Sequence, residues 1–554
     1  MMSSLVLVKK YGFPSFPIVL GLSVFYFLLG WNVLNPQNID WLLQANNQDS
    51  VQHFVGWEFF RYEPWHFPLG LIKSYGTPID TSIVYTDSIP LFAFFFKCFA
   101  RYLPDHFQYF GLWFALCFIL QGVFAWLLIS LITDNILCRI VGTLFFLISP
   151  IFLNRIVQHQ ALSAQWVLLA ALYFYLRSYQ KHLPLIWLIL NSVVLLIHAY
   201  LAVMVWMIWI AFLIKNKSKS IFYFIQVNMW LVLLAWISGY FVLGLTAVKA
   251  GGYQINAMNL LGPFLPGNWF PILPGDWSRL LPTYHAVANL QYYEGNNYFG
   301  FGFLLLILPG CYYTVKNFRI IVRHIPSHLP LLFVLVFLFC YSISNKITWG
   351  EHILFQYHLP KKITFMVDTF RDAGRFFWPV YYSCMLIAFY MICRHGKKNS
   401  AVVIILLAMA LQIFDLSSEL NKLHKFFSVK YPTSVLHHED FFQQAIGKYH
   451  KIILLPPVDR PDIKIKNFAQ YAFYAAHNHF TINNGYFARV DLNKMAQYRK
   501  KSIHAFTRNP LETNTIYIVT DIYLLGLIKS KLKAEDKVIR EGRDFIIATN
   551  WSTM

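Results

Sequence analysis

The chain has 554 residues, of which 57% are hydrophobic, 18% aromatic and only 13% charged, and its mean hydropathy is +0.47. A soluble globular chain carries about a quarter charged residues, so this composition excludes an ordinary soluble domain and predicts a polytopic membrane protein. The formal net charge of +20 does not indicate nucleic-acid binding, because the lysines and arginines are scattered and form no basic stripe; it fits basic cytoplasmic loops and affinity for anionic lipid.

About eleven apolar segments near bilayer-spanning length recur along the chain. The first, residues 16–34, follows Lys9 and Lys10. Because its apolar run is long and no small-residue cleavage site follows, we expect a retained signal anchor and not a cleaved signal peptide. The others are predicted at residues 110–132, 140–153, 161–176, 183–198, 200–214, 221–245, 299–315, 329–344, 376–393 and 401–414.

Basic residues in the short loops indicate the cytoplasmic side. They recur in alternate loops, at Lys9, Lys10, Arg139, Arg177, Lys215, Lys316 and Arg394. The opposite set of loops contains three long ones, residues 35–109, 248–298 and 345–375. This alternation predicts a transmembrane domain of residues 1–415 with a cytoplasmic N-terminus and the long loops on the outer face. In the first loop, Ile89–Leu103 is apolar but contains Lys97 and Arg101, which predicts a helix lying in the membrane interface.

The composition changes after about residue 415. Three segments have the character of buried strands and two that of amphipathic helices: Lys451–Pro456, Thr515–Thr520, Asp544–Thr549, Asn467–His479 and Asp521–Leu532. Their alternation predicts a small α/β domain over residues 416–554. The odd number of spans puts this domain outside the cytoplasm. It has no glycine-rich phosphate-binding motif, so nucleotide binding is not indicated.

The first long loop contains an unusual stretch, DSVQHFVGWEFFRYEPWHFPLG, from Asp49 to Gly70. It mixes carboxylates, imidazoles, a guanidinium and indoles directly after the first span, a mixture that suits a polar substrate on a lipid carrier. The candidate site residues here are Asp49, His53, Trp57, Glu58, Arg61, Trp65 and His66. The indoles would stack on sugar rings or line a lipid groove.

Further polar clusters are predicted on the same outer face, where ionisable groups of a membrane protein are costly and often functional. They are the TDSIP turn with Asp87, NRIVQHQ with Arg155, His159 and Gln160, QYYEGNNYFGFG with Glu294, Asn296 and Tyr298, and TFRDAGRFFWP with Arg371, Asp372 and Arg375.

These residues suggest a division of roles. Asp49 would act as general base towards an acceptor hydroxyl, which attacks an anomeric carbon and expels a phosphate. Arg371 and Arg375 would stabilise that phosphate. Asp87 and Glu294 would bind sugar hydroxyls or a divalent cation.

Structural roles stay open for the same residue types. Asp49 can cap an interfacial helix, and Asp87 can cap a helix or close an Asx turn. Glu58 and Arg61, three residues apart, are typical of a pair on a helix surface.

The two arginines and the histidines have alternatives too. Arg371 and Arg375 can anchor the flank of a membrane span or pair with Asp368 and Asp372. The histidines lack ligand spacing, and the seven cysteines form no CxxC or Cys/His pattern, so no metal site made of histidines or cysteines is predicted, and a divalent cation at the carboxylates stays an open alternative.

The stretches DSVQHFVGWEFFRYEPWHFPLG, YEGNNYFGFG and FRDAGRFFWPVYY resemble a bacterial integral membrane family, itself without an assigned activity, that is related to the GT-C glycosyltransferase superfamily. The resemblance covers roughly residues 15–415. It implies that Asp49 stands at the catalytic acidic position and Asp87 at the second acidic position. Asp49 is followed by Ser50 and not by a second acidic residue, which favours a metal-independent mechanism.

The resemblance implies a GT-C-like polytopic fold and transfer of a hexose or pentose from a polyprenyl-phosphate-linked donor. The acceptor would be an envelope polysaccharide, lipid or protein on the outer face of the bacterial inner membrane. Two other classes remain open: a transporter or flippase for an envelope lipid or polysaccharide, and a non-enzymatic envelope scaffold. Transporters often place broken helices in repeated halves, and this sequence has no visible repeat.

Overall fold

The computed structural model describes residues 15–43, 48–177, 182–216, 220–244, 252–267, 277–288, 291, 294–428, 438–457 and 468–551. Lys9 and Lys10, which begin the predicted loop pattern, lie outside these residues. The chain forms two compact units. Unit 1 consists of Met1–Asn38, Tyr109–Leu231 and Ala250–Lys430, and unit 2 of Ile39–Gln108, Val232–Lys249 and Tyr431–Met554.

Unit 1 is built from helices. They are α2 (Phe16–Leu29), α5 (Phe110–Ile132), α6 (Ile136–Leu147), α7 (Pro150–Val157), α8 (Trp166–Leu176), α9 (Leu183–Leu195), α10 (Ala199–Asn216), α12 (Phe301–Lys316), α13 (Phe318–Ile343), α14 (Lys361–Asp368), α15 (Trp378–His395) and α16 (Lys398–Ser428). Short elements complete it: η1 (Asn32–Leu34), η4 (Gln160–Ser163), β3 (Lys346–Trp349), β4 (His352–Gln356) and η6 (Ala373–Phe377). Helix α11 (Ser220–Ser238) begins in unit 1 and ends in unit 2.

Six helices of the described residues are long and apolar enough to cross a membrane, or seven if the pair α6 and α7, bent by 41°, forms one span. Each of the eleven predicted apolar segments coincides with one of these helices, with the bent pair or with a shorter apolar helix. The multi-pass helical class is therefore confirmed, and the count of eleven crossings stays a prediction.

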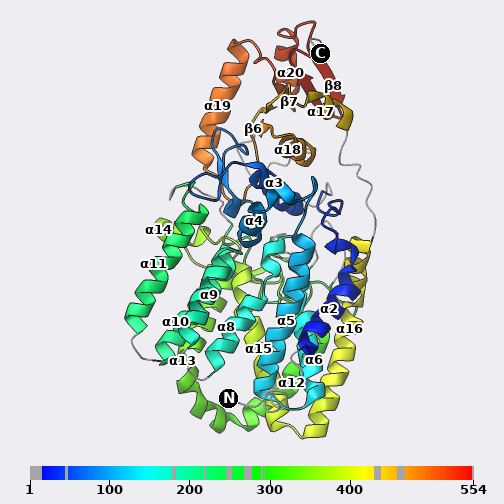
Figure 1. Cartoon of the computed structure of the whole chain (residues 1–554). Helices are drawn as coiled ribbons and strands as arrows, with labels where there is room; N and C mark the ends of the chain where they lie inside the picture. Colours follow the sequence, from blue (N-terminus) through cyan, green and yellow to red (C-terminus); the bar gives the residue numbers. More distant parts are fainter. Residues whose placement is uncertain are drawn as a thin grey trace. The chain divides into compact units, whose positions relative to one another are not determined.

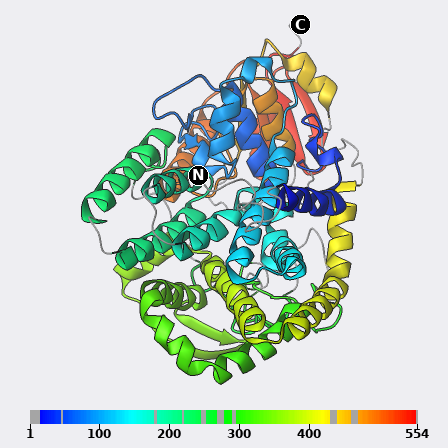
Figure 2. The ribbon, with the colours of Figure 1, turned by 60° about the horizontal axis from the view of Figure 1, so that its bottom comes forward.

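Small residues allow the helices of unit 1 to approach closely. Figures 1 and 2 show α2 beside α5 and α16, and α12 lies against α16 and α15. A Cβ atom at Gly21 of α2 would lie 2.5 Å from the carbonyl oxygen of Phe118 in α5. A Cβ atom at Gly302 of α12 would lie 2.0 Å from the carbonyl oxygen of Ala408 in α16. Both helix pairs therefore depend on the missing side chain.

The last apolar helix extends well beyond its predicted end. The last apolar segment was expected to end at residue 414, but α16 continues to Ser428. Asp415 and Glu419 are buried on this helix, so a drop in apolar character did not mark a helix end. The predicted domain boundary at residue 416 falls inside α16, and the division of roles between residues 1–415 and 416–554 stays a prediction.

Unit 2 contains a five-stranded sheet in the order β6-β5-β7-β9-β8. Its strands are β5 (Lys451–Leu455), β6 (Thr481–Ile482), β7 (Ile516–Val519), β8 (Lys537–Glu541) and β9 (Asp544–Ala548). Strand β5 runs parallel to β6 and β7, and β9 runs antiparallel to β7 and β8. One sheet face packs on α19 (Leu492–Arg508) and α20 (Ile522–Lys529) through a core around Leu455, Val519 and Ile528.

The predicted small α/β region is therefore confirmed. Its three predicted strands correspond to β5, β7 and β9, and its two predicted helices correspond to α18 (Phe468–His477) and α20. Strands β6 and β8 and helices α17 (Glu439–Ala445) and α19 were not predicted. Strand β6 has only two residues, too few to show an alternating pattern.

The first long loop also belongs to unit 2, and it is largely folded. It contains α3 (Gln48–Tyr62), β1 (Leu71–Ile72), β2 (Thr81–Ser82), η2 (Ile83–Tyr85), α4 (Pro90–Lys97) and η3 (Ala100–Tyr102). Helix α3 packs against α18, and Tyr75 forms a parallel bridge with Ile482 beside the sheet. The single interfacial helix predicted over Ile89–Leu103 is wrong in extent, because α4 ends at Lys97 and only η3 follows.

Candidate functional site

A buried ion cluster in unit 1 forms around the carboxylate of Glu294. Arg375 donates two hydrogen bonds to it, from Nε to Oε2 at 2.7 Å and from Nη2 to Oε1 at 2.6 Å. Nη1 of Arg155 lies 3.2 Å from Oε2, and Nε2 of His159 lies 3.5 Å from Oε1. The side chain of Glu294 is 6% exposed, so this carboxylate is held by two guanidinium groups with little help from water.

Asp372 extends the cluster on the other side of Arg375. Its Oδ2 lies 3.1 Å from Nη2 of Arg375 and accepts a hydrogen bond of 3.2 Å from the hydroxyl of Tyr200. Its Oδ1 accepts a hydrogen bond from Nδ2 of Asn256 and lies 3.6 Å from Nε of Arg371. We call Arg155, Glu294, Arg371, Asp372 and Arg375 the arginine cluster.

Local backbone geometry brings these residues together. Arg155 lies in α7, Arg375 in η6 just before α15, and Glu294 in the segment that leads to α12. A Cβ atom at Gly374 would lie 2.6 Å from the carbonyl oxygen of Glu294, so only glycine permits η6 to approach this segment so closely.

The positive charges of the cluster lower the pKa of Glu294. Burial by itself raises the pKa of this carboxyl group, but Arg155 and Arg375, with hydrogen bonds from Arg375 and His159, hold the pKa well below its ordinary range. Glu294 is therefore ionised, and its charge is committed to the arginines.

The structure thus joins residues of three separately predicted polar clusters: His159, Glu294, Arg371 and Arg375 lie in one network. Tyr200 and Asn256 were not predicted, and they have no local signal in the sequence, because each is a single polar residue whose role depends on contacts made across unit 1. Asp372 and Arg155 lie in polar stretches that were predicted. Asp372 is next to Arg371 in the sequence, and Arg155 is four residues before His159, so the sequence did point to both.

Three other predicted residues of unit 1 have structural contacts. Tyr298 is fully buried, and its hydroxyl donates a hydrogen bond of 2.8 Å to Oδ2 of Asp415. Asn296 accepts a hydrogen bond from the backbone N–H of Tyr298, and Gln160 is fully buried, with Nε2 donating to the carbonyl oxygen of Val157. Asp415 was missed by sequence reasoning.

Asp49 lies in the first turn of α3 in unit 2, where a carboxylate interacts favourably with the helix dipole. Its Oδ1 accepts a hydrogen bond of 3.2 Å from the hydroxyl of Tyr486. This hydroxyl belongs to the segment after β6, far along the chain, so Asp49 stands where the first long loop meets the C-terminal region within unit 2.

Glu58 and Arg61 do not form the predicted surface pair. Their side chains are 0% and 2% exposed, with Nη1 of Arg61 3.8 Å from Oε1 of Glu58. Arg61 also donates to the carbonyl oxygens of four residues: Ala100, Leu103, Pro104 and Asp105. The three-residue spacing correctly predicted that Glu58 and Arg61 are in contact. The pair is buried and not at a surface, because α3 packs against the rest of unit 2.

The remaining candidates of unit 2 differ in exposure. Trp57 is fully buried and donates to the carbonyl oxygen of Phe107 at 2.9 Å, whereas Trp65 is 49% exposed. His53 is fully buried, and His66 lies 3.0 Å from Oε1 of Glu63. Of these, Trp65 is the side chain available for stacking.

Asp87 has a left-handed backbone with φ of 54° and is half-buried. It does not cap α4, whose N-cap is Ile89, so the N-cap alternative is wrong.

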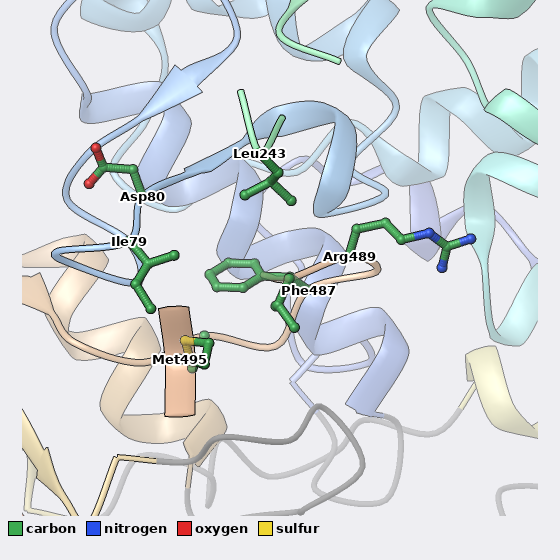
Figure 3. Close-up of a pocket in the computed structure, with 9 residues that line it drawn as sticks. Ile79, Asp80, Leu243, Phe487, Arg489 and Met495 are labelled. Carbon is green, nitrogen blue, oxygen red and sulfur yellow. The ribbon is translucent and has the colours of Figure 1, made fainter. Parts of the chain in front are cut away.

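Unit 2 has a small hollow lined by Gly76, Ile79, Asp80, Leu243, Gly485, Phe487, Arg489, Val490 and Met495. Figure 3 shows the Phe487 ring between Leu243 and Met495, while the Arg489 side chain extends away from Asp80. The free volume of about 10 Å³ is the space of about one water molecule, which is too small for a sugar.

Comparison with known proteins gives a family. Residues 18–417 match the family described as a domain of unknown function (DUF6311), and residues 441–548 match the DUF6311 C-terminal domain. No curated protein matches the chain significantly in sequence.

Among solved structures, the chain is similar to the archaeal oligosaccharyltransferase AglB from Archaeoglobus fulgidus, in complex with an inhibitory peptide and a dolichol-phosphate. The identity is 10% and the TM-score 0.41, over 93% of this chain and 70% of that chain. A score at this level does not establish a common fold.

Proposed function

The chain belongs to the family described by the domain of unknown function DUF6311, and on that premise we propose that it is a membrane glycosyltransferase. It transfers a hexose or pentose from a polyprenyl-phosphate donor to a cell-envelope acceptor on the outer face of the inner membrane. Residues 416–554 lie outside the cytoplasm in this proposal and serve acceptor binding.

The arginine cluster is the observation that supports this function most. Three guanidinium groups and two carboxylates lie together in a unit built from apolar helices. Such a concentration of buried charge is expensive to maintain and is found where a membrane protein handles an ionic substrate. Arginine offers several fixed N–H donors, which match the oxygens of a phosphate group.

The proposed reaction is a single displacement. The acceptor hydroxyl forms a new bond to the anomeric carbon, the bond from that carbon to the phosphate oxygen breaks, and polyprenyl phosphate leaves with the bonding electrons. Asp49 accepts the proton of the attacking hydroxyl, and Arg371 and Arg375 stabilise the charge that develops on the phosphate.

The test is a transfer assay with purified protein in lipid nanodiscs. The donors are polyprenyl-monophosphoryl hexoses and pentoses with a labelled sugar, and the acceptor is an envelope extract from a strain that lacks the protein. We expect Asp49→Asn to reduce transfer by about a hundredfold or more, the contribution typical of a general base. Asp134→Asn, a change at an aspartate of unit 1 whose side chain is 95% exposed, is the matched control and should leave transfer unchanged.

Full transfer by Asp49→Asn would show that the catalytic assignment is wrong. Absence of transfer from every donor by the wild-type protein, in a preparation that unfolds cooperatively, would remove the enzyme proposal itself.

A second candidate function is favoured by the bend between α6 and α7. The pair is bent by 41°, and α7 carries Arg155 in its last turn. Discontinuous helices near a polar site are typical of transporters. Movement of a fluorescent polyprenyl-phosphoryl sugar across vesicles, unchanged in Asp49→Asn, would support a transporter or flippase.

A further inference from the structure

The loop between α13 and α15 is tied at both ends to helices of membrane-spanning character. The stretches Ile325–Ile343 and Ala373–His395 are both long and apolar enough to cross a membrane. Strand β3 begins three residues after Ile343, and a chain of three residues spans about 10 Å at most. At the other end, α14 ends at Asp368, five residues before the second stretch begins. The loop is therefore held close to the membrane surface.

Strand β3 fixes the hairpin of this loop to the rest of unit 1. Nδ2 of Asn259 donates to the carbonyl oxygen of Gly350 at 2.8 Å, and its Oδ1 accepts from the backbone N–H of Gly350 at 2.9 Å. The backbone N–H of Leu260 donates to the carbonyl oxygen of Thr348 at 3.0 Å. Strand β4 pairs only with β3 among the described residues, so it forms the outer edge of the hairpin.

Strand β4 exposes apolar side chains on both of its faces. All five of its residues are exposed, and Ile353, Leu354 and Phe355 are 48%, 58% and 60% exposed. Successive side chains of a strand point to opposite faces, and a strand with water on one side usually has a polar face there. Strand β4 has no such face, while its unpaired edge still needs hydrogen-bond partners. The headgroup region of a bilayer offers both an apolar and a polar environment.

Helix α14 also turns apolar side chains outward. Lys361, Lys362, Phe365 and Met366 lie on one side of the helix, and all four are exposed, Met366 by 69%. Val367, on the other side, packs against the core of unit 1. A helix that presents apolar side chains together with lysines is typical of a helix in the membrane interface. The lysine stems can lie along the apolar surface while their ammonium groups reach the lipid phosphates.

The charges of the loop favour an anionic partner. Residues 346–368 contain three lysines and two carboxylates, Glu351 and Asp368. Glu351 follows the hairpin turn, whereas Asp368 is half-buried at the end of α14, so the exposed charge of this helix comes from its two adjacent lysines. A second copy of this chain would bring the same lysines to an interface, whereas anionic lipid complements them.

We propose that the exposed sides of β4 and α14, here called the β4–α14 surface, lie in the headgroup region of the adjoining bilayer leaflet and bind anionic phospholipid. Ile353, Leu354 and Phe355 insert between the headgroups, and Lys361 and Lys362 meet the lipid phosphates. This contact does not depend on glycosyl transfer.

The experiment measures hydrogen–deuterium exchange of the full-length protein in two kinds of nanodisc, one of phosphatidylcholine alone and one with an equal part of phosphatidylglycerol. Each lysine at an anionic surface strengthens attachment by about fivefold, so exchange in peptides of residues 352–366 should slow by about fivefold or more with phosphatidylglycerol. At about 1 M salt, where charges are screened beyond about 3 Å, most of this difference should disappear.

Two double variants separate the lysines from the apolar side chains. Lys361→Gln combined with Lys362→Gln should remove the dependence on phosphatidylglycerol. Leu354→Ser combined with Phe355→Ser should speed exchange in both kinds of nanodisc. All four side chains are exposed, so the melting temperature in detergent should change little.

The matched control is Lys500→Gln combined with Lys501→Gln, at two adjacent exposed lysines of α19 in unit 2. This change should leave the exchange of residues 352–366 unaltered in both kinds of nanodisc. If the serine variant does not fold, the lysine variant decides.

Equal exchange of wild-type residues 352–366 in the two lipid compositions would overturn the inference, and so would unchanged exchange in a folded serine variant. Protection that increases with protein concentration in detergent and ignores lipid composition would mean that a second copy covers the β4–α14 surface. That result would also overturn the inference, and it would leave the glycosyltransferase proposal untouched.

Discussion

Glu58 is a carboxyl group enclosed in unit 2. Its side chain is fully buried, and its two oxygens accept no hydrogen bond from the described residues. Burial, opposed by Arg61 and reinforced by Asp105, raises the pKa of Glu58 from 4.5 to about 8. Between pH 4.5 and 8 the folded chain therefore keeps a proton that the unfolded chain releases. The free energy of unfolding falls as the pH rises through this window.

We therefore expect Glu58→Gln, which stays neutral, to flatten the pH dependence of thermal unfolding. Its advantage over the wild type should grow from pH 5 towards pH 8, measured by intrinsic fluorescence of the protein in detergent. Glu512→Gln removes a carboxyl group that is 59% exposed in unit 2 and serves as control. Equal slopes for Glu58→Gln and the wild type would contradict the assigned pKa direction.

Close helix contacts in unit 1 depend on glycine. At Gly302 of α12, an added Cβ atom would lie 2.0 Å from the carbonyl oxygen of Ala408 and 2.7 Å from Cβ of Gln412 in α16. Backbone atoms cannot swing aside as a flexible side chain can, so the two helices would have to separate.

Gly302→Ala should therefore lower the free energy of unfolding by about 1–3 kcal/mol, the cost typical of overpacking. The melting temperature in detergent measures this change. The control is Gly526→Ala in α20, where a Cβ atom would meet nothing within 4 Å. That change should be neutral or slightly stabilising, since alanine favours a helix more than glycine does. A Gly302→Ala protein as stable as the control would show that α12 and α16 pack differently.

At the scale of the whole chain, the testable property is its orientation in the membrane. Arg155, Glu294 and Arg375 come from three different predicted outer loops, and they meet in one cluster of unit 1. Loops that meet must emerge at the same end of their helices, which agrees with the alternation of basic and polar loops in the sequence.

Reporter fusions test the direction. Alkaline phosphatase fused after Met554 should be active, because we expect the C-terminal region outside the cytoplasm, and the same enzyme fused after Lys316 should be inactive. A fluorescent protein that folds only in the cytoplasm should give the opposite result at both positions. Reversed signals would invert the predicted orientation and place the arginine cluster at the cytoplasmic end.

The elements were predictable to different degrees. Apolar segments and the strands Lys451–Leu455, Ile516–Val519 and Asp544–Ala548 were found because each has a continuous run of residues that need burial. Helix α3 was not recognised as a buried helix, because its charged residues Asp49, Glu58 and Arg61 are typical of a helix at a surface or interface. Only partners distant in sequence, such as α18, explain why it is buried.

The sequence by itself determined the membrane class, the places of the apolar helices, the small α/β region and the polar stretches in which Glu294, Arg371 and Arg375 stand. These properties are local, because helix length, apolar runs and composition depend on residues that are close together in the sequence. The tertiary structure decided which charges meet. Arg155 and Arg375 bind the same carboxylate, and Glu58 loses its contact with water, because packing brings together residues that no sequence spacing relates.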